Sequence, residues 1–138
     1  MQIRQFLEDD RIPVINLWKE CNLIFPQNDP QRDIDRKQDN DPDLFLVGIM
    51  DNEIIASVMG GYEGHRGWAY YLAVKPTLQT NGYGRKIMDE LERRLLAKGC
   101  PKLNLMVRTG NVSVIEFYNS LGFLQDDVVC LGKRLIRD

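Results

Sequence analysis

The stretch Gln79-Thr80-Asn81-Gly82-Tyr83-Gly84-Arg85-Lys86 lies between two segments of different periodicity. Residues 68–74 before it form an apolar run that is typical of a β-strand, whereas apolar residues after it recur every three or four positions and predict a helix. The two glycines let the backbone curl, so that successive N–H groups can point into one concavity at the helix start, where the helix dipole favours an anion. The stretch is therefore predicted to hold a phosphate group.

Two cations in the first helical turn support this interpretation. Arg85 and Lys86 work against the helix dipole by about 0.3–1 kcal/mol each, and a bound anion would explain this locally unfavourable choice. The alternative is a solvent-exposed helix start with two solubilising cations. Two better-known phosphate loops are excluded by spacing, because the dinucleotide fingerprint G-x-G-x-x-G would need glycine at Ile87 and the P-loop pattern has no match.

The chain before this stretch predicts a strand, two helices and an antiparallel meander. The strand covers residues 1–6, and the first helix presents Ile12, Ile15, Leu17, Trp18 and Cys21 on one face. Asp29 is predicted to cap a short polar helix that begins at Pro30 and runs toward Lys37, with Ile34 as its apolar anchor. Residues 44–50, 54–61 and 68–74 are the three strands of the meander.

The chain after it predicts two more helices and two or three strands. The expected elements are a helix with Ile87, Met88, Leu91, Leu95 and Leu96 on one face and Gly99 at its end, a strand with Leu103, Leu105 and Val107, a helix over 114–121 closed by Gly122, and one or two strands within 128–136. The order β-α-α-β-β-β-α-β-α-β indicates an α/β domain with a mixed sheet.

Composition limits the domain count and the class of protein. The 138 residues are 43% hydrophobic and 28% charged, with a net charge of −2, which is ordinary for a globular protein with one core. We expect a single domain over residues 1–138, located in the cytoplasm, because no run is long and apolar enough for a membrane span or a signal peptide. The near-neutral charge predicts no general attraction to nucleic acid or to membranes.

Cysteine and histidine usage argues against metal or disulfide chemistry. Cys21, Cys100 and Cys130 are widely separated, and His65 is the one histidine that could join them in a metal site. We therefore predict three reduced thiols and no metal.

Two motifs resemble those of the GNAT superfamily of acetyl-coenzyme A-dependent N-acetyltransferases. The family pattern V-x-P-x-x-[QR]-x-x-G-x-[GA] is matched by Val74, Pro76, Gln79, Gly82 and Gly84, and N-x-x-A-x-x-x-Y-x-x-x-G-F is matched by Asn111, Tyr118, Gly122 and Phe123, with Val114 in place of the alanine. Residues 28–30, 60–72 and 131–136 also look like the small bacterial acetyltransferases of the YpeA type. The resemblance covers the whole chain.

This resemblance implies a fold and a co-substrate. The fold is α/β (α+β), with a mixed, mostly antiparallel sheet of six to seven strands flanked by about four helices and splayed between the third meander strand and the strand at Leu103 to Val107. Acetyl-CoA would be the co-substrate. The resemblance implies that the backbone of Leu72, Ala73 and Val74 binds the pantetheine arm. The pyrophosphate would be bound by Gln79, Thr80, Asn81, Gly82, Tyr83 and Gly84, with Arg85 and Lys86 nearby. Asn111 would contact the pantetheine arm, and Tyr118 would approach the thioester sulfur.

Tyr118 is the implied proton donor to the departing thiolate. A thiolate whose thiol has a pKa near 8.5 leaves moderately well unaided, so a phenol of pKa about 10 would assist the step without dominating its rate. General acid–base catalysis typically raises a rate by about 10²–10⁴-fold. The alternative is that Tyr118 is a core aromatic residue beside Phe117.

The proton acceptor is harder to assign. Related enzymes carry a glutamate at positions that hold Trp68 and Met106 here, and neither side chain can accept a proton. Glu63 and His65 are the candidates in the loop before Trp68, although both residue types are commonly solvated at a surface. Without a strong base, a low-pKa amine fits better, since deprotonation at pH 7 costs roughly 4.6 kcal/mol for lysine but roughly 1.1 kcal/mol for an α-amine.

The leading hypothesis is an N-acetyltransferase that acts by direct attack of a primary amine, from a small molecule or a peptide N-terminus, on the thioester. The alternative from another class is a non-catalytic module that binds acyl-CoA as a sensor. Nucleic-acid binding through the cations of residues 85–98 is disfavoured, because acidic residues alternate with them. The acceptor, the acyl-chain preference and the oligomeric state, with a homodimer among the options, are left open.

Overall fold

The computed structural model describes residues 1–138. Contacts within the chain divide it into two compact units, residues 1–104 together with Asp138 and residues 105–137. None of the helices has both the length and the apolar character needed to cross a bilayer.

The first unit is built on one sheet with the strand order β1-β2-β3-β4-β5. The strands are β1 (Gln2–Gln5), β2 (Phe45–Met50), β3 (Glu53–Tyr62), β4 (Gly67–Val74) and β5 (Leu103–Asn104). Strands β1 to β4 pair antiparallel and β5 pairs parallel with β4, so the predicted mixed, mostly antiparallel sheet and its meander are confirmed. Pairing between β4 and β5 ends after Trp68, which agrees with the predicted splay between these strands.

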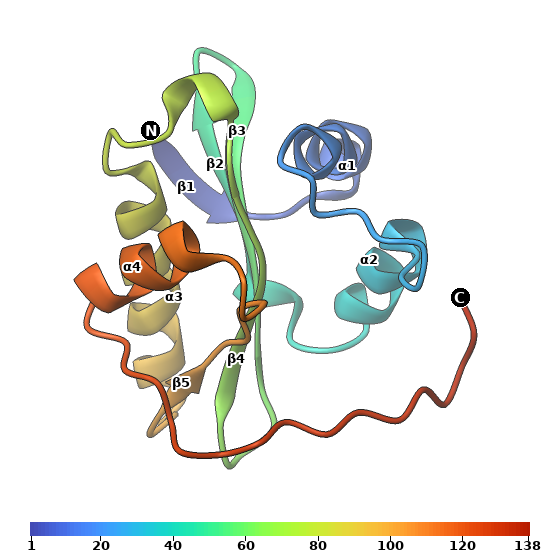
Figure 1. Ribbon diagram of the computed structural model, residues 1–138. Helices are drawn as coiled ribbons and strands as arrows, with labels where there is room; N and C mark the ends of the chain where they lie inside the picture. The colour runs from blue at the N-terminus through green and yellow to red at the C-terminus, as the bar shows by residue number, and fades with distance from the viewer. The chain divides into compact units, whose positions relative to one another are not determined.

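Helices cover both faces of this sheet (Figure 1). On one face lie α1 (Arg11–Glu20) and α2 (Pro30–Gln38), whose buried side chains join a core cluster with β2, β3 and β4 that contains Phe6, Val14, Ile15, Leu17, Trp18, Ile34, Phe45, Val47, Met59 and Ala73. On the other face lies α3 (Tyr83–Ala97), which buries Ile87, Met88, Leu91 and Leu95. The two faces of β4 therefore meet different helices.

Helix α2 begins as the sequence predicts. The side chain of Asp29 accepts hydrogen bonds from the backbone N–H groups of Gln31 and Arg32, which satisfies two donors at the helix start, and Pro30 occupies the first helical position. Ile34 is fully buried. The cap and the single anchor fix a polar helix against the sheet.

Some predictions at the ends of elements are wrong. Ile12 and Leu96, expected on buried helix faces, are 68% and 72% exposed. Position at a helix end is not the reason, because Val14 in the first turn of α1 and Leu95 in the last turn of α3 are buried. At 3.6 residues per turn, Ile12 is turned about 160° from Val14 and Leu96 about 100° from Leu95, so both lie off the buried face.

The strand count is also corrected. The sheet has five strands where six to seven were expected, because the strand predicted through Val107 ends at Asn104 and residues 128–136 form no strand. The apolar side chains of that last segment, Val128, Val129, Leu131, Leu135 and Ile136, are exposed. Alternating apolar residues favour a strand, but a strand also needs a partner for its backbone groups.

The second unit contains α4 (Val112–Ser120), which confirms the last predicted helix. Gly122 follows the helix with a φ of +94°, a conformation that suits glycine after a helix end. The ring of Tyr118 makes edge-to-face contacts with Phe117 and Phe123, with centroid distances of 5.1 and 5.6 Å.

Candidate active site

The loop between β4 and α3 owes its curvature to one glycine and one threonine. Gly82 precedes α3 with a φ of +85°, and Thr80 has a φ of +66°. The sequence attributed the curl to Gly82 and Gly84, but Gly84 lies within the first turn of α3 and its φ is not positive. What Gly84 contributes instead is a first turn without a side chain at that position.

Side-chain amides hold the loop to the end of β4. Gln79 Nε2 donates to the carbonyl of Val74 over 3.0 Å, and Asn81 Nδ2 donates to the carbonyls of Leu78 and Gln79, each over 3.1 Å. The Val74 carbonyl also accepts from Cys21 Sγ over 3.3 Å. These bonds fix the loop relative to the strand without using the backbone N–H groups of the helix start.

The start of α3 is open to an anion. Gly82 provides no capping side chain, and the first turn contains no acidic residue. Lys86 Nζ lies 5.7 Å from the centroid of the Tyr83 ring, a cation–π contact that keeps a positive charge at this end of the helix. The uncapped N–H groups, the dipole and the cation fit a phosphate group, and the assignment of Gln79 to Lys86 to the pyrophosphate stays a prediction.

Strand β4 is interrupted by a bulge just before this loop. Met59 pairs with Tyr70 and Ser57 pairs with Ala73, so two residues of β4, Tyr71 and Leu72, stand opposite the one residue between Ser57 and Met59 on β3. Tyr71 has a φ of +53°, which is uncommon for a residue with a Cβ atom. The bulge thus lies at the start of Leu72–Val74, the stretch predicted to bind the pantetheine arm.

Buried side chains hold the bulge in place. Ser57 Oγ donates to the Tyr71 carbonyl over 2.9 Å, and Trp18 Nε1 donates to Ser57 Oγ over 2.9 Å. The rings of Trp18 and Tyr71 stack with their centroids 3.8 Å apart. Because a trans peptide places its C=O and N–H on opposite sides, these bonds turn the Leu72 N–H away from Ser57.

The phenol of Tyr71 contacts a carboxylate on α2. Its hydroxyl donates to Asp33 Oδ2 over 2.6 Å. Burial, followed by the bond to Asp33, raises the pKa of Tyr71, so the phenol remains protonated at physiological pH. A half-buried carboxylate is thus held at the bulge.

Asn111 and Tyr118 belong to the second unit. Asn111 occupies the position before α4, and its Oδ1 accepts from Ser113 Oγ over 3.4 Å. Burial raises the pKa of the Tyr118 phenol to about 12, so it keeps its proton at neutral pH. Their roles toward the co-substrate stay predictions.

Glu63 and His65 lie in the turn between β3 and β4. Both are exposed, and Glu63 Oε1 accepts from the backbone N–H groups of His65 and Arg66 over 2.8 and 2.6 Å. The bond from Arg66 in particular lowers the pKa of Glu63. The carboxylate of Glu63 therefore stabilises its own turn, which lies at the opposite end of β4 from the Gln79–Lys86 loop.

No group of three or more His, Cys, Asp or Glu side chains is arranged to hold a metal ion.

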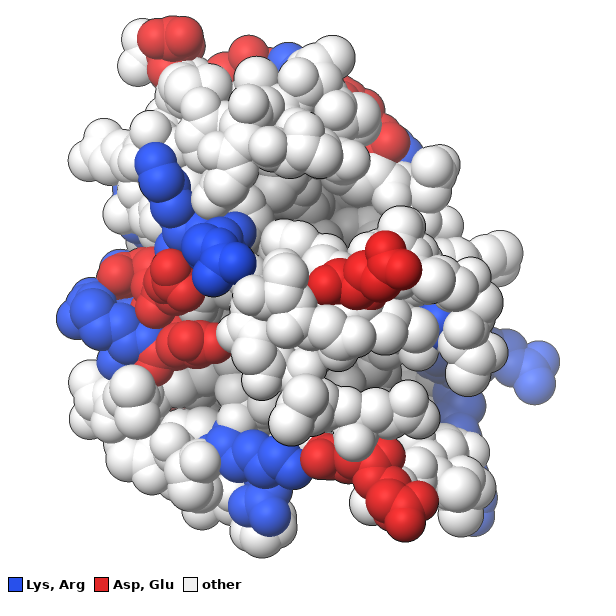
Figure 2. Space-filling view, turned by 60° about the vertical axis from the view of Figure 1, so that its left-hand side comes forward, with Lys and Arg blue, Asp and Glu red and all other residues white.

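The cations of α3 are mixed with carboxylates. Glu90 pairs with Arg93 and Arg94 over 2.6 and 3.0 Å, and Lys98 pairs with Asp43 over 3.0 Å. Figure 2 shows basic and acidic side chains side by side on this face of the molecule, with no continuous basic area.

Sequence reasoning missed the residues that form and support the bulge. A weak signal was present for Ser57, which is polar at a position where the alternation of Ile55 and Met59 predicts an inward-facing apolar residue. Nothing in the sequence pairs Asp33 with Tyr71, because 38 residues separate them.

Comparisons with known proteins cover the whole chain. The family model described as "Acetyltransferase (GNAT) family" matches residues 12–123. An acetyltransferase of Sodalis glossinidius is 52% identical over 139 residues, and one of Pectobacterium atrosepticum is 51% identical over 138 residues; each match covers 100% of this chain and 98% of the relative. The solved structure of AAC(6′)-Iy in complex with the bisubstrate analog CoA-S-monomethyl-acetylneamine aligns with a TM-score of 0.79 at 17% identity, covering 96% of this chain and 97% of that one.

Proposed function

Because the chain belongs to the GNAT acetyltransferase family, we propose that it transfers the acetyl group of acetyl-CoA to a primary amine of a small molecule or of a peptide N-terminus, in the cytoplasm. The observation that carries this proposal is the uncapped start of α3 after the Gln79–Asn81 turn, which offers backbone N–H groups and a positive charge to a pyrophosphate. The side chain of Gln79 ties this loop to the end of β4 at Val74.

The reaction is a direct transfer. The neutral amine nitrogen attacks the thioester carbon, and the new C–N bond forms as the C–S bond breaks. The nitrogen gives up one proton and the departing thiolate gains one, the step at which Tyr118 would act as donor. Backbone N–H groups of Leu72 to Val74 are the proposed partners of the pantetheine arm. Within this scheme the Leu72 N–H is of special interest, since Ser57 and Trp18 fix its direction.

The pKa of Tyr118 limits what this phenol can do. Full proton transfer from a group of pKa about 12 to a thiolate of pKa near 8.5 is uphill by roughly 5 kcal/mol. Hydrogen-bond donation to the developing thiolate costs no such transfer. We therefore expect Tyr118 to stabilise the leaving thiolate by a hydrogen bond, and the thiolate to take its proton from water.

The solved structure of AAC(6′)-Iy supports the proposal at the level of the fold, because that protein is in complex with a bisubstrate analog that contains CoA. At 17% identity it carries no information on the acceptor of this chain. The resemblance of sequence and fold thus leaves the acceptor to experiment.

A screen of amines and peptides with acetyl-CoA, monitored by thiol release and corrected for hydrolysis without acceptor, tests the proposal. Release that depends on an acceptor, together with an acetylated product of the expected mass, would support it. Tight binding of acetyl-CoA with no turnover on any acceptor would favour the alternative, a non-catalytic sensor of acyl-CoA.

A further inference from the structure

The proposed transfer requires a group that takes a proton from the amine. An ammonium ion has no lone pair, so the acceptor must be neutral when it attacks, or lose its proton as it does. Trp68 and Met106, at the positions where related enzymes carry a glutamate, cannot accept it. A carboxylate elsewhere in the structure is needed, unless the amine is already neutral.

Distance along β4 disfavours the turn that holds Glu63 and His65. That turn precedes Gly67, and from Gly67 to Leu72 a strand advances roughly 16 Å at about 3.3 Å per residue. Glu63 is also occupied by two N–H groups of its own turn. A side chain at that end of β4 does not reach a reaction at Leu72.

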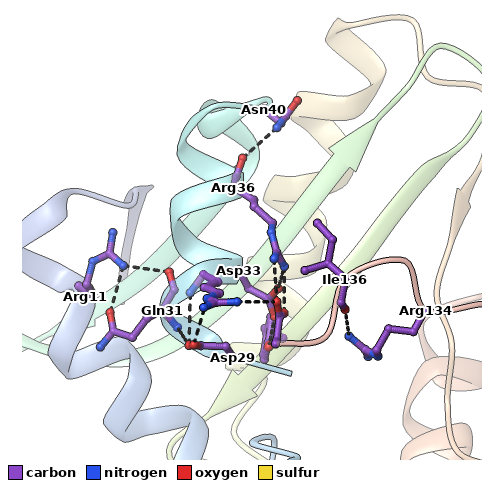
Figure 3. A network of polar contacts seen from close by, with 11 residues as sticks. Arg11, Asp29, Gln31, Asp33, Arg36, Asn40, Arg134 and Ile136 are labelled. Carbon is purple, nitrogen blue, oxygen red and sulfur yellow. Dashed lines mark hydrogen bonds and ion pairs between the residues drawn. The ribbon is translucent and has the colours of Figure 1, made fainter. Parts of the chain in front are cut away.

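Asp33 lies at the right end of the strand. Its Oδ2 accepts from the hydroxyl of Tyr71, the residue next to Leu72, and its Oδ1 is 3.5 Å from Arg36 Nη1. Arg36 makes a shorter, two-point contact with Asp138, over 2.7 and 3.0 Å. Figure 3 shows Asp33 and Arg36 on α2 within this network. Because a carboxylate can accept about four hydrogen bonds, Asp33 retains capacity for another donor.

The bulge also brings two tyrosines to the same face. Residues directly opposite in an antiparallel pair have side chains on the same face of the sheet, so Tyr70 shares a face with its partner Met59. Met59 belongs to the core cluster beneath α1 and α2, so this is the face that those helices cover. Tyr71 stacks on Trp18 of α1 and so lies on that face too. Tyr70 is 44% exposed, so it presents an aromatic surface on the face where Tyr71 contacts Asp33, and an aromatic surface suits a cationic amine.

Two substrates can meet at one carbon only if they approach it from different sides. The loop proposed for the pyrophosphate begins α3, which covers the other face of the sheet (Figure 1). The face of α1 and α2, with Asp33 and the two tyrosines, is therefore left for the amine.

We propose that Asp33 is a catalytic residue that binds the ammonium group of the acceptor beside Tyr71 and takes its proton. The role rests on the proposed acetyltransferase function. An ammonium acceptor loses two protons when it becomes an amide. The first passes to Asp33, and the freed lone pair forms the C–N bond as the C–S bond breaks. The second leaves the same nitrogen through water and protonates the thiolate, so the products are an amide, a free thiol and a protonated Asp33. Tyr71 is a positioning residue that holds one carboxylate oxygen.

Carboxylates outnumber guanidinium groups around Asp33. Asp29 and Asp138 face the Tyr71 hydroxyl together with Asp33, while Arg32 and Arg36 each pair with Asp138. The acidic groups favour a cation here, and the two arginines keep the carboxylates from repelling one another.

The test compares Asp33→Asn with Asp35→Asn, which makes the same chemical change two residues along α2, where the carboxylate pairs with Arg11. Each variant is assayed with the acceptor found in the screen and with its fluorinated analogue, whose ammonium group is far more acidic. We expect Asp33→Asn to lower kcat/KM by about 10²-fold or more for the basic amine but by less than about threefold for the weakly basic one. Asp35→Asn should leave both values unchanged.

Two further measurements keep the outcome clear. Tyr71→Phe should reproduce a smaller loss, about tenfold, with the same dependence on amine basicity, and acetyl-CoA affinity by calorimetry should be unchanged in both variants. An equal loss for the two amines, or none, would overturn the role of Asp33 while leaving the proposed function intact. A wild-type protein that acetylates neither amine would overturn the proposed function itself, and this role with it.

Discussion

The indole Nε1 of Trp18 donates to Ser57 Oγ over 2.9 Å, and neither side chain is exposed to solvent. Ser57 in turn donates to the carbonyl of Tyr71, so a buried hydroxyl joins helix α1 to the irregular part of β4. Burying a polar group without a hydrogen bond costs free energy. Here the Ser57 hydroxyl accepts from the Trp18 N–H and donates to the Tyr71 carbonyl, so all three groups are satisfied. The link is a support for the bulge that adjoins the proposed site.

Replacing Ser57 with alanine should therefore affect both stability and catalysis. It leaves the Trp18 N–H without an acceptor and the Tyr71 carbonyl without this donor, at about 1–3 kcal/mol for each buried group left unsatisfied. We expect lower stability in urea and a lower kcat, with a smaller change in the acetyl-CoA dissociation constant. Trp18→Phe, which keeps a ring but removes the donor, should show part of both effects. Wild-type kcat in a measurably destabilised Ser57→Ala protein would separate the bulge from the chemistry.

Gly82→Val should abolish coenzyme A binding, measured by calorimetry, in a protein that remains folded. The substitution strains a backbone with positive φ by about 1–2 kcal/mol and places a side chain at the helix start. Gly99→Val is the matched control, because Gly99 has a φ of +82° at the other end of α3 and is equally open. Both variants should lose similar stability, but Gly99→Val should bind coenzyme A normally. Equal affinities in the two proteins would remove the pyrophosphate from this loop.

Tyr118→Phe should lower kcat by about 10–10³-fold with little change in acetyl-CoA affinity, as expected for an interaction made mainly in the transition state. Phe117→Leu, which alters the neighbouring aromatic contact but no hydroxyl, serves as the packing control. Steady-state kinetics with thiol detection provide the measurement. A normal kcat would mean that Tyr118 only packs against Phe117 and Phe123.

Glu63→Gln and His65→Gln should each leave kcat/KM within about threefold, because both residues lie at the far end of β4 from the proposed chemistry. The alkaline limb of the pH profile should then follow the pKa of the acceptor itself. If kcat/KM fell by about 10²-fold in either variant, a loss of roughly 2.7 kcal/mol of transition-state stabilisation, the replaced residue would be the proton acceptor.

The ion pairs of Glu90 predict a specific dependence of stability on pH. Its bonds with Arg93, and then Arg94, lower the pKa of Glu90 to about 2, below the value of about 4.3 for an unfolded chain. The stabilisation is therefore complete above pH of about 4.3 and is lost as the pH falls toward 2. The stability difference between wild type and Glu90→Gln should shrink over that interval in urea titrations. Glu92 should show the opposite dependence on pH. Burial raises the pKa of Glu92, so protonation at low pH stabilises the folded state, and the ionised carboxylate destabilises it at neutral pH. Glu92→Gln should therefore be more stable than wild type at neutral pH, with the difference shrinking as the pH falls.

The elements that sequence reasoning predicted are those that local pattern determines. Periodicity placed α1 and α3, and the cap at Asp29 placed the start of α2. Strands β2, β3 and β4 were predictable because their apolar runs are separated by short turns.

What could not be predicted depends on distant partners. Residues 128–136 have the composition of a strand, yet no strand pairs with them, and Tyr71 has no local sign of a positive φ. The bond between Asp33 and Tyr71 arises from how α2 packs on β4, and this packing is not encoded in any short segment. The sequence analysis attributed the curl of the loop to Gly82 and Gly84, because glycine adopts a positive φ at least cost, whereas Thr80 and Gly82 are the residues that adopt it.

The bulge at Tyr71 depends on the number of residues between Tyr70 and Ala73 more than on their identity. A chain shorter by one residue there would pair β3 and β4 in a single unbroken register, since the two shifted halves of the ladder differ by one position. Deletions are tolerated in surface loops, but a deletion of one residue here would straighten the strand and release the Tyr71 carbonyl from Ser57. Side chains along β4 would then alternate regularly between the two faces of the sheet. Within β4, the number of residues is therefore a structural requirement of the proposed site.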